Sequence, residues 1–118
     1  ARLQRLLRLT KLDNDRKAIG YRHVRLSCGG TVLSEAHNWY VRSRLTEAMN
    51  RQLDETNTPF GKAVAALNFR REPLLTQAGC AGTCPAGTIS THRALLRLPD
   101  GRPLALVIEY YTPANLGR

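Results

Sequence analysis

The chain has 118 residues, 42% of them hydrophobic, which suits one folded domain and is too apolar for a disordered protein. No apolar stretch reaches the ~18 residues needed to cross a bilayer, so we expect no membrane span. The formal net charge is +9, from 18 basic and 9 acidic residues, which suits a partner that carries negative charge.

Arginine supplies 15 of the 18 basic residues. Its planar guanidinium suits bidentate binding of a carboxylate or phosphate, and it is equally common in nucleic-acid binders. The charge therefore does not choose between these partners.

The N-terminal segment 1–12 carries Arg2, Arg5 and Arg8 and has no uninterrupted apolar core, so it does not resemble a secretory signal. Its leucine spacing fits a helix and also the end of a strand, and both remain open. We expect a single domain over residues 1–118. Because the sequence does not begin with Met, it is open whether this domain is complete at its N-terminus.

A β-hairpin is the first predicted element. Residues 21–28 alternate in polarity, Gly29-Gly30 is typical of a tight turn, and 31–41 continues as an extended run. Two helices are predicted next. The first covers 43–55, where Leu45, Met49 and Leu53 have helical spacing and Thr46 is the expected N-cap.

The second helix is predicted to begin at Thr58-Pro59 and to run to Leu67, with Thr58 as its cap. An extended segment over 68–76 and a Gly-rich loop over 77–90 follow. Residues 91–98 and 104–112 then form a hairpin across an Asp-Gly turn. Two hairpins around a helical insert predict an α+β fold, an antiparallel sheet with helices packed on one side.

Two charged residues break the strand patterns. In the first strand, Arg22 shares a face with Val24 and Leu26, so it should point inward. In the last strand, both faces are largely apolar, which predicts a central strand, and Glu109 is its only charge. Buried charges need partners. Arg22 and Glu109 therefore either pair with each other, lie at strand ends in water, or face a shared ligand cavity.

The cysteines are Cys28, Cys80 and Cys84, an odd number at irregular spacing that is unlike a disulfide framework, so a cytoplasmic location is the default. Cys80, Cys84 and His92 fall short of the four ligands that zinc prefers, so we expect no metal and an incidental cysteine pair in a loop. His23 is expected on the polar face of its strand, and strand aromatics such as Trp39 are expected in the core.

Three segments, taken in order, resemble the bacterial chorismate lyase family over roughly residues 18–113. They are the hairpin YRHVRLSCGGTVLSEAHNWYV at 21–41, the turn Thr-Pro-Phe-Gly at 58–61, and the closing hairpin HRALLRLPDGRPLALVIEYYTP at 92–113. The resemblance implies a sheet whose helices close over an internal cavity. It also implies elimination of pyruvate from chorismate to leave 4-hydroxybenzoate, without metal or cofactor.

By position, the resemblance implies that Arg22 holds the carboxylate of the aromatic ligand and that Glu109 is the catalytic glutamate near its hydroxyl. Phe60 matches a leucine that lines the family's pocket. The family's Gly-Arg pair aligns with His37-Asn38, or with a neighbour one residue away, so its second cation is missing here unless a protonated His37 replaces it in part.

A chorismate-type lyase is therefore the leading functional prediction, with a small aromatic carboxylate as its ligand. The alternative is a non-catalytic sensor domain that binds such a ligand, which the missing arginine favours. Nucleic acid is the least expected partner, because it would explain the +9 charge and leave Arg22 and Glu109 unexplained.

Overall fold

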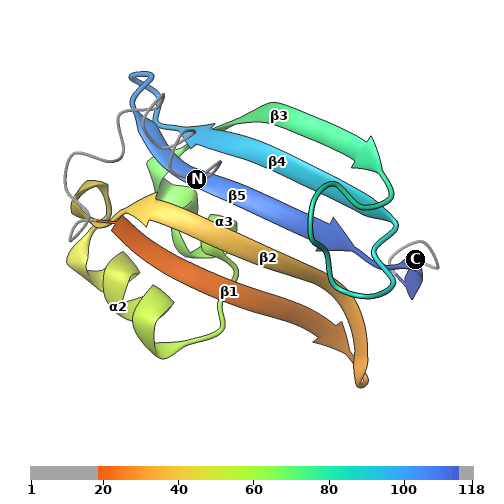
Figure 1. The fold of residues 1–118 in the computed structure, drawn as a ribbon. Coiled ribbons are helices and arrows are strands. Elements are labelled where there is room, and N and C mark those ends of the chain that lie inside the picture. The colour runs from red at the N-terminus through yellow and green to blue at the C-terminus, as the bar shows by residue number, and fades with distance from the viewer. Residues whose placement is uncertain (1–18, 115–118) are drawn as a thin grey trace.

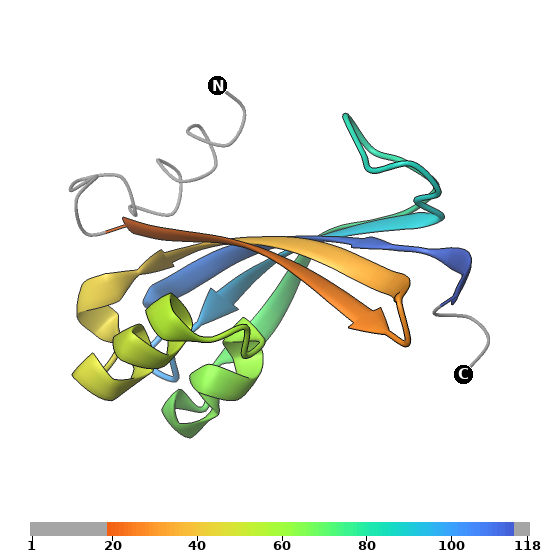
Figure 2. The same cartoon turned by 90° about the horizontal axis from the view of Figure 1, so that it is seen from below.

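The computed structural model describes residues 19–114 (Figure 1). They form a five-stranded antiparallel sheet in the order β1-β2-β5-β4-β3. The helices lie on one face of the sheet, and the loop between β3 and β4 rises from the other (Figure 2). The predicted α+β class with an antiparallel sheet is therefore confirmed. The two interpretations of residues 1–12 lie outside the described residues.

Every strand predicted within the described region is present, and so is the first helix; the second predicted helix is divided into a four-residue α-helix and a separate 3-10 turn. The strands are β1 Ile19–Cys28, β2 Thr31–Val41, β3 Arg70–Ala78, β4 Ser90–Arg97 and β5 Pro103–Tyr111. The helices are α2 Glu47–Glu55 and α3 Phe60–Ala63, with short 3-10 turns η2 Arg42–Arg44 and η3 Ala65–Leu67. In the described sheet β5 is the middle strand, as its two apolar faces predicted.

Glycine makes both hairpin turns possible. Gly29 and Gly30 have φ values of 57° and 82°, and Gly101 has a φ of 90°, all in the left-handed region that favours glycine. Gly20 serves a different need, because a Cβ there would lie 2.4 Å from the ring of Tyr40. The ring therefore packs directly on the backbone of β1.

Helix α2 begins with the predicted cap. The Thr46 hydroxyl accepts a hydrogen bond from the Met49 amide at 3.1 Å. The helix starts later than predicted, because η2 occupies the preceding residues. Arg42 in η2 donates to both carboxylate oxygens of Asp54 at 3.0 and 2.7 Å, which fixes α2 against the end of β2.

The prediction that Thr58 caps the second helix is wrong. Pro59 is the cap residue of α3, and the described structure shows no side-chain cap hydrogen bond there. The Thr58 hydroxyl instead lies 2.8 Å from the Thr56 hydroxyl and accepts from Gln52 at 3.3 Å. It is therefore engaged with the end of α2.

The expectation that Cys80 and Cys84 are an incidental pair, in a chain unlike a disulfide framework, is corrected, because the structure joins them in a disulfide. Positive φ at Gly79, Gly82 and Gly87 lets the loop double back, so that the two Cα atoms lie 5.9 Å apart. This disulfide joins two cysteines only four residues apart. The number of cysteines in the whole chain gives no signal of such a local bridge. The cysteine pattern therefore no longer supports the predicted cytoplasmic location, which stays a prediction.

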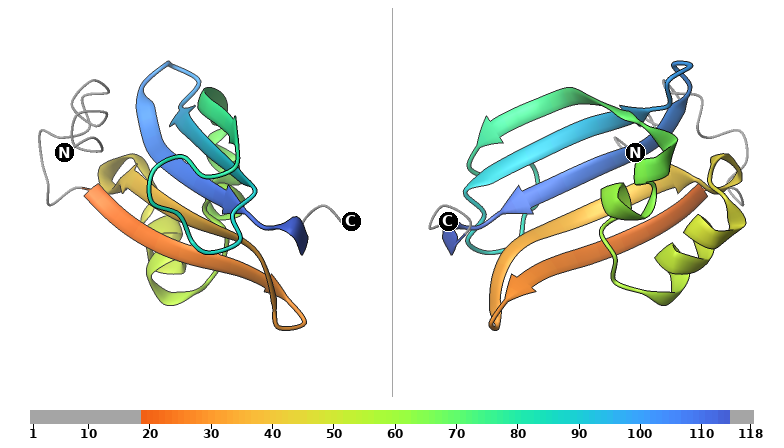
Figure 3. Two further views of the ribbon diagram at one scale, coloured as in Figure 1. Left: turned by 45° about the vertical axis from the view of Figure 1, so that its right-hand side comes forward. Right: turned by 180° about the vertical axis from the view of Figure 1, so that it is seen from behind.

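The core lies between the sheet and the helices. Tyr40 stacks at a tilt on Phe60, with ring centroids 5.2 Å apart. The buried cluster comprises Tyr40, Leu45, Leu53, Phe60, Val64, Ala94, Leu96, Leu98, Leu104, Ala105 and Val107. Figure 3 shows α2 and α3 gathered over one end of the sheet, where β1 begins and β2 ends. Among residues 19–114, no helix is long and apolar enough to cross a membrane.

Candidate functional site

A cavity of about 310 Å³ lies between the helix-side face of the sheet and the segment 57–61; we call it the inner cavity. Its walls combine aliphatic and aromatic side chains with a few polar groups. The lining residues are Val24, Arg25, Leu26, Ser34, Ala36, Asn38, Asn57, Pro59, Phe60, Gly61, Phe69, Arg71, Leu96, Val107, Glu109 and Tyr111. Its size and composition suit a small ligand with an apolar body and polar ends.

Glu109 lies on the central strand β5 and faces the inner cavity with 22% of its side chain exposed. Its Oε1 accepts from Nη2 of Arg71 at 2.5 Å. Arg71 reaches the cavity from β3, because its register partner on β4 is Leu96, which also lines the cavity. Sequence reasoning missed Arg71, because residues 68–76 were predicted only as an extended segment without an identified partner strand. Such a segment gives no signal of which of its faces is buried.

Arg22 is only 9% exposed and lies against the end of α2, and it is not one of the residues that line the inner cavity. Its register partner across β1 and β2 is Asn38, which lines the cavity. Nη2 donates to the Thr56 carbonyl at 3.0 Å. Nη1 is buried and has no hydrogen-bond partner among the described residues. An unpartnered buried guanidinium nitrogen is costly, so this position favours an acceptor from outside residues 19–114.

Arg22 and Glu109 share the helix-side face of the sheet, but they do not pair. Strand β2 lies between the strands that carry these two residues. On β2, Asn38 is opposite Arg22 and Ala36 is opposite Glu109. Two strand spacings and two residue rises separate their Cα atoms by roughly 12 Å. Direct pairing of Arg22 with Glu109, one of the arrangements that the sequence left open, is therefore not observed. Glu109 instead forms an ion pair with Arg71.

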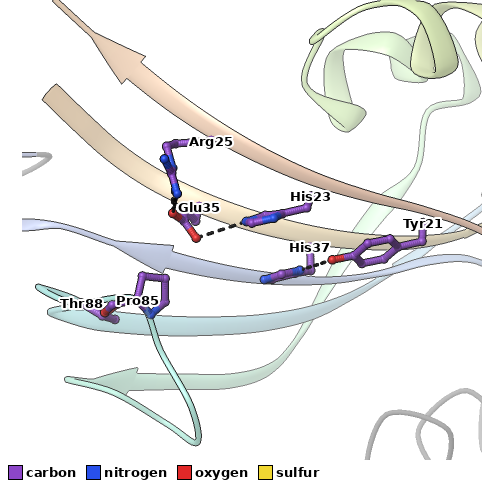
Figure 4. Close-up of polar contacts among 7 residues, drawn as sticks. All are labelled: Tyr21, His23, Arg25, Glu35, His37, Pro85 and Thr88. Carbon is purple, nitrogen blue, oxygen red and sulfur yellow. Dashed lines mark hydrogen bonds and ion pairs between the residues drawn. The ribbon is translucent and has the colours of Figure 1, made fainter. Parts of the chain in front are cut away.

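Of the other predicted site residues, Asn38 and Phe60 line the inner cavity. His37 lies on the opposite face of β2, because neighbouring strand residues alternate between faces. There its ring stacks on His23 at 4.4 Å, and its Nδ1 lies 2.7 Å from the Tyr21 hydroxyl (Figure 4).

The protonation of His37 also argues against a role in the inner cavity. Burial lowers the pKa of His37, and the nearby charge of His23 lowers it further. The expectation that a protonated His37 replaces the missing arginine therefore has no geometric support, and Arg71 is the cation that the structure places beside Glu109.

Tyr111 completes the polar end of the inner cavity. Burial raises the pKa of its phenol, and the negative charge of Glu109 raises it further. The phenol is thus protonated at neutral pH and available as a donor. The inner cavity therefore has two arginines, Arg25 and Arg71, with the carboxylate of Glu109 and the phenol of Tyr111 around a largely apolar wall. Residues 19–114 contain no group of three or more His, Cys, Asp or Glu placed to hold a metal.

Comparison with known proteins adds one curated relative. No protein-family model matches the chain. The chain is 41% identical over 112 residues to an uncharacterised protein, y4mC, of Sinorhizobium fredii (strain NBRC 101917 / NGR234). The match covers 80% of this chain and 47% of that protein, so the chain spans about half the length of the relative.

Proposed function

We propose that this chain is a chorismate-lyase-type domain that eliminates pyruvate from chorismate or a related enolpyruvyl acid, leaving a 4-hydroxybenzoate-type product. The observation that carries the proposal is the buried Nη1 of Arg22, which lacks a partner within residues 19–114. The register partner of Arg22, Asn38, lines a cavity of ligand size. A ligand carboxylate would satisfy that nitrogen with a charge-assisted hydrogen bond. Glu109 lies on the same face of the sheet, with its Cα roughly 12 Å from that of Arg22.

The reaction needs no external oxidant or reductant. The bond between the ring carbon and the enolpyruvyl oxygen breaks, and the ring carbon that bears the hydroxyl loses its proton. The ring becomes aromatic, and the proton balance is restored when the released enol becomes pyruvate. In this scheme Glu109 accepts or relays a proton near the hydroxyl end, and Arg22 holds the opposite carboxylate.

Arg71 strengthens the case for a substrate with two negative charges. The sequence lacks an arginine at positions 37–38, but the fold brings Arg71 to the inner cavity from β3. Its guanidinium, 43% exposed, reaches Glu109 and has further donors for an anionic group. One cation therefore serves each end of the ligand.

A sensor domain without catalysis is the second candidate. It is favoured by the 2.5 Å contact between Arg71 and Glu109, because one oxygen of that carboxylate is already occupied by a guanidinium. Such a domain would bind the aromatic acid and release no pyruvate.

Binding of 4-hydroxybenzoate tests the role of Arg22. We expect calorimetry to show binding by the wild type and about tenfold or more weaker binding by Arg22→Lys, which keeps the charge but loses the guanidinium fork. Arg70→Lys is the matched control, because Arg70 is exposed and lies on β3, at the opposite edge of the sheet from Arg22 on β1. Equal affinity in the two variants would remove Arg22 from the site.

A further inference from the structure

A second cavity of about 310 Å³ lies on the face of the sheet opposite the helices; we call it the outer cavity. Pro85 and Ala86, from the loop tied by the Cys80–Cys84 disulfide, form one side of it. Val32 and Tyr110 of the sheet form the apolar side, and Glu35 and Arg25 supply its charges.

The charge centre of the outer cavity is Glu35, which is buried with only 11% of its side chain exposed. Its Oε1 accepts from Nε of Arg25 at 2.8 Å, and its Oε2 lies 3.2 Å from Nε2 of His23 (Figure 4). Burial raises the pKa of Glu35, but the hydrogen bonds from Arg25 and His23 outweigh that effect and hold it below the usual range. Glu35 is therefore an ionised carboxylate at neutral pH.

The two side chains that contact the Glu35 carboxylate are more exposed than Glu35 itself. Arg25 has 58% and His23 has 45% of its side chain in solvent, whereas the carboxylate is fixed beneath them. Exposed ion pairs are weak and exchange readily. A ligand cation can thus replace a surface side chain at Glu35 without exposing the carboxylate, and Arg25 keeps donors free for a ligand anion.

We propose that the outer cavity binds a zwitterionic α-amino acid with an apolar or aromatic side chain. Its ammonium group would meet Glu35, its carboxylate would meet Arg25, and its side chain would lie against Val32, Tyr110 and Pro85. A simple anion would face the buried carboxylate, and a simple amine would face the guanidinium. A ligand with one charge of each sign matches both.

The outer cavity is distinct from the inner one although the same strands form both. Along β2, Ser34 faces the inner cavity and Glu35 the outer one. Along β5, Glu109 and Tyr111 face the inner cavity and Tyr110 the outer one. Only Arg25, on the edge strand β1, borders both. Substitutions at Glu35 or Ala86 therefore probe the outer cavity alone.

The test is calorimetric titration with L-phenylalanine, L-tryptophan and L-leucine, compared with 3-phenylpropionate and phenethylamine, which each lack one charge of phenylalanine. We expect at least one amino acid to bind and the matched single-charge analogues to bind at least tenfold more weakly. Absence of binding by all three amino acids at millimolar concentration overturns the proposal. So does equal affinity for phenylalanine and either analogue.

Two variants locate the binding. Ala86→Trp places a large ring on an exposed loop position at the cavity wall and should abolish amino-acid binding. Glu35→Gln should weaken amino-acid binding tenfold or more. If this substitution of a buried residue prevents folding, Ala86→Trp and the single-charge analogues still test the proposal. Glu109→Gln is the control and should leave amino-acid binding unchanged, so this result stands apart from the proposed lyase activity. Binding that survives in folded Ala86→Trp belongs elsewhere and contradicts the proposal.

Discussion

Replacing Glu109 with glutamine is expected to reduce the release of pyruvate from chorismate by about 10²–10⁴-fold while substrate affinity changes little. Glutamine keeps the shape and the hydrogen-bonding capacity of Glu109 but cannot accept the proton. It also frees Arg71, whose guanidinium now pairs with the carboxylate at 2.5 Å. Steady-state kinetics with pyruvate detection gives kcat and KM separately, which distinguishes a lost proton transfer from lost binding.

The control for Glu109→Gln is Glu72→Gln on the edge strand β3. Glu72 also pairs with an arginine, Arg97, but it is exposed and does not line the inner cavity. Unchanged turnover in Glu72→Gln together with the large loss in Glu109→Gln assigns the effect to the cavity. A Glu109→Gln variant with wild-type kcat would exclude acid–base catalysis by this residue.

Replacing Phe60 with alanine is expected to lower the free energy of unfolding by about 3–5 kcal/mol. Phe60 is 4% exposed and packs against Tyr40 and the rest of the buried cluster, so truncation removes apolar burial and leaves a void. Urea unfolding followed by circular dichroism measures the change. Because domains of this size are stabilised by only about 5–15 kcal/mol, the variant should contain a measurable unfolded fraction.

Leu74→Ala provides the comparison for Phe60→Ala. Leu74 is 43% exposed on β3, and surface substitutions of this kind usually change the free energy of unfolding by less than about 0.5 kcal/mol. Similar losses in both variants would show that Phe60 does not anchor α3 to the sheet.

The strand and helix pattern was predictable because local signals were strong. Gly29-Gly30 and Asp100-Gly101 identified both hairpins. The alternation of β1 predicted that Arg22 points inward, but the relation of Arg22 to Glu109 was left open until the register of the sheet was known. Phe60 and Asn38 line the inner cavity, and their roles in ligand binding stay predictions. The middle position of β5 followed from its two apolar faces. Each of these features depends on residues that are near one another in the sequence.

Features that depend on long-range register were not predictable. Arg71 reaches Glu109 only because β3 pairs with β4, which pairs with β5, and no local pattern encodes that relation. The predicted pair His37-Asn38 spans both faces, so one of the two had to lie away from the cavity. The Cys80–Cys84 bridge depends on three glycines with positive φ, which composition identified only as a loop.

The proposed reaction is tested most directly by incubating the purified protein with chorismate and measuring both products by chromatography. We expect 4-hydroxybenzoate and pyruvate to appear in equal amounts with the wild type and far more slowly with Glu109→Gln. If the wild type binds 4-hydroxybenzoate and forms neither product, the inner cavity belongs to a sensor domain. If it neither binds 4-hydroxybenzoate nor forms pyruvate, the chorismate-lyase proposal is contradicted.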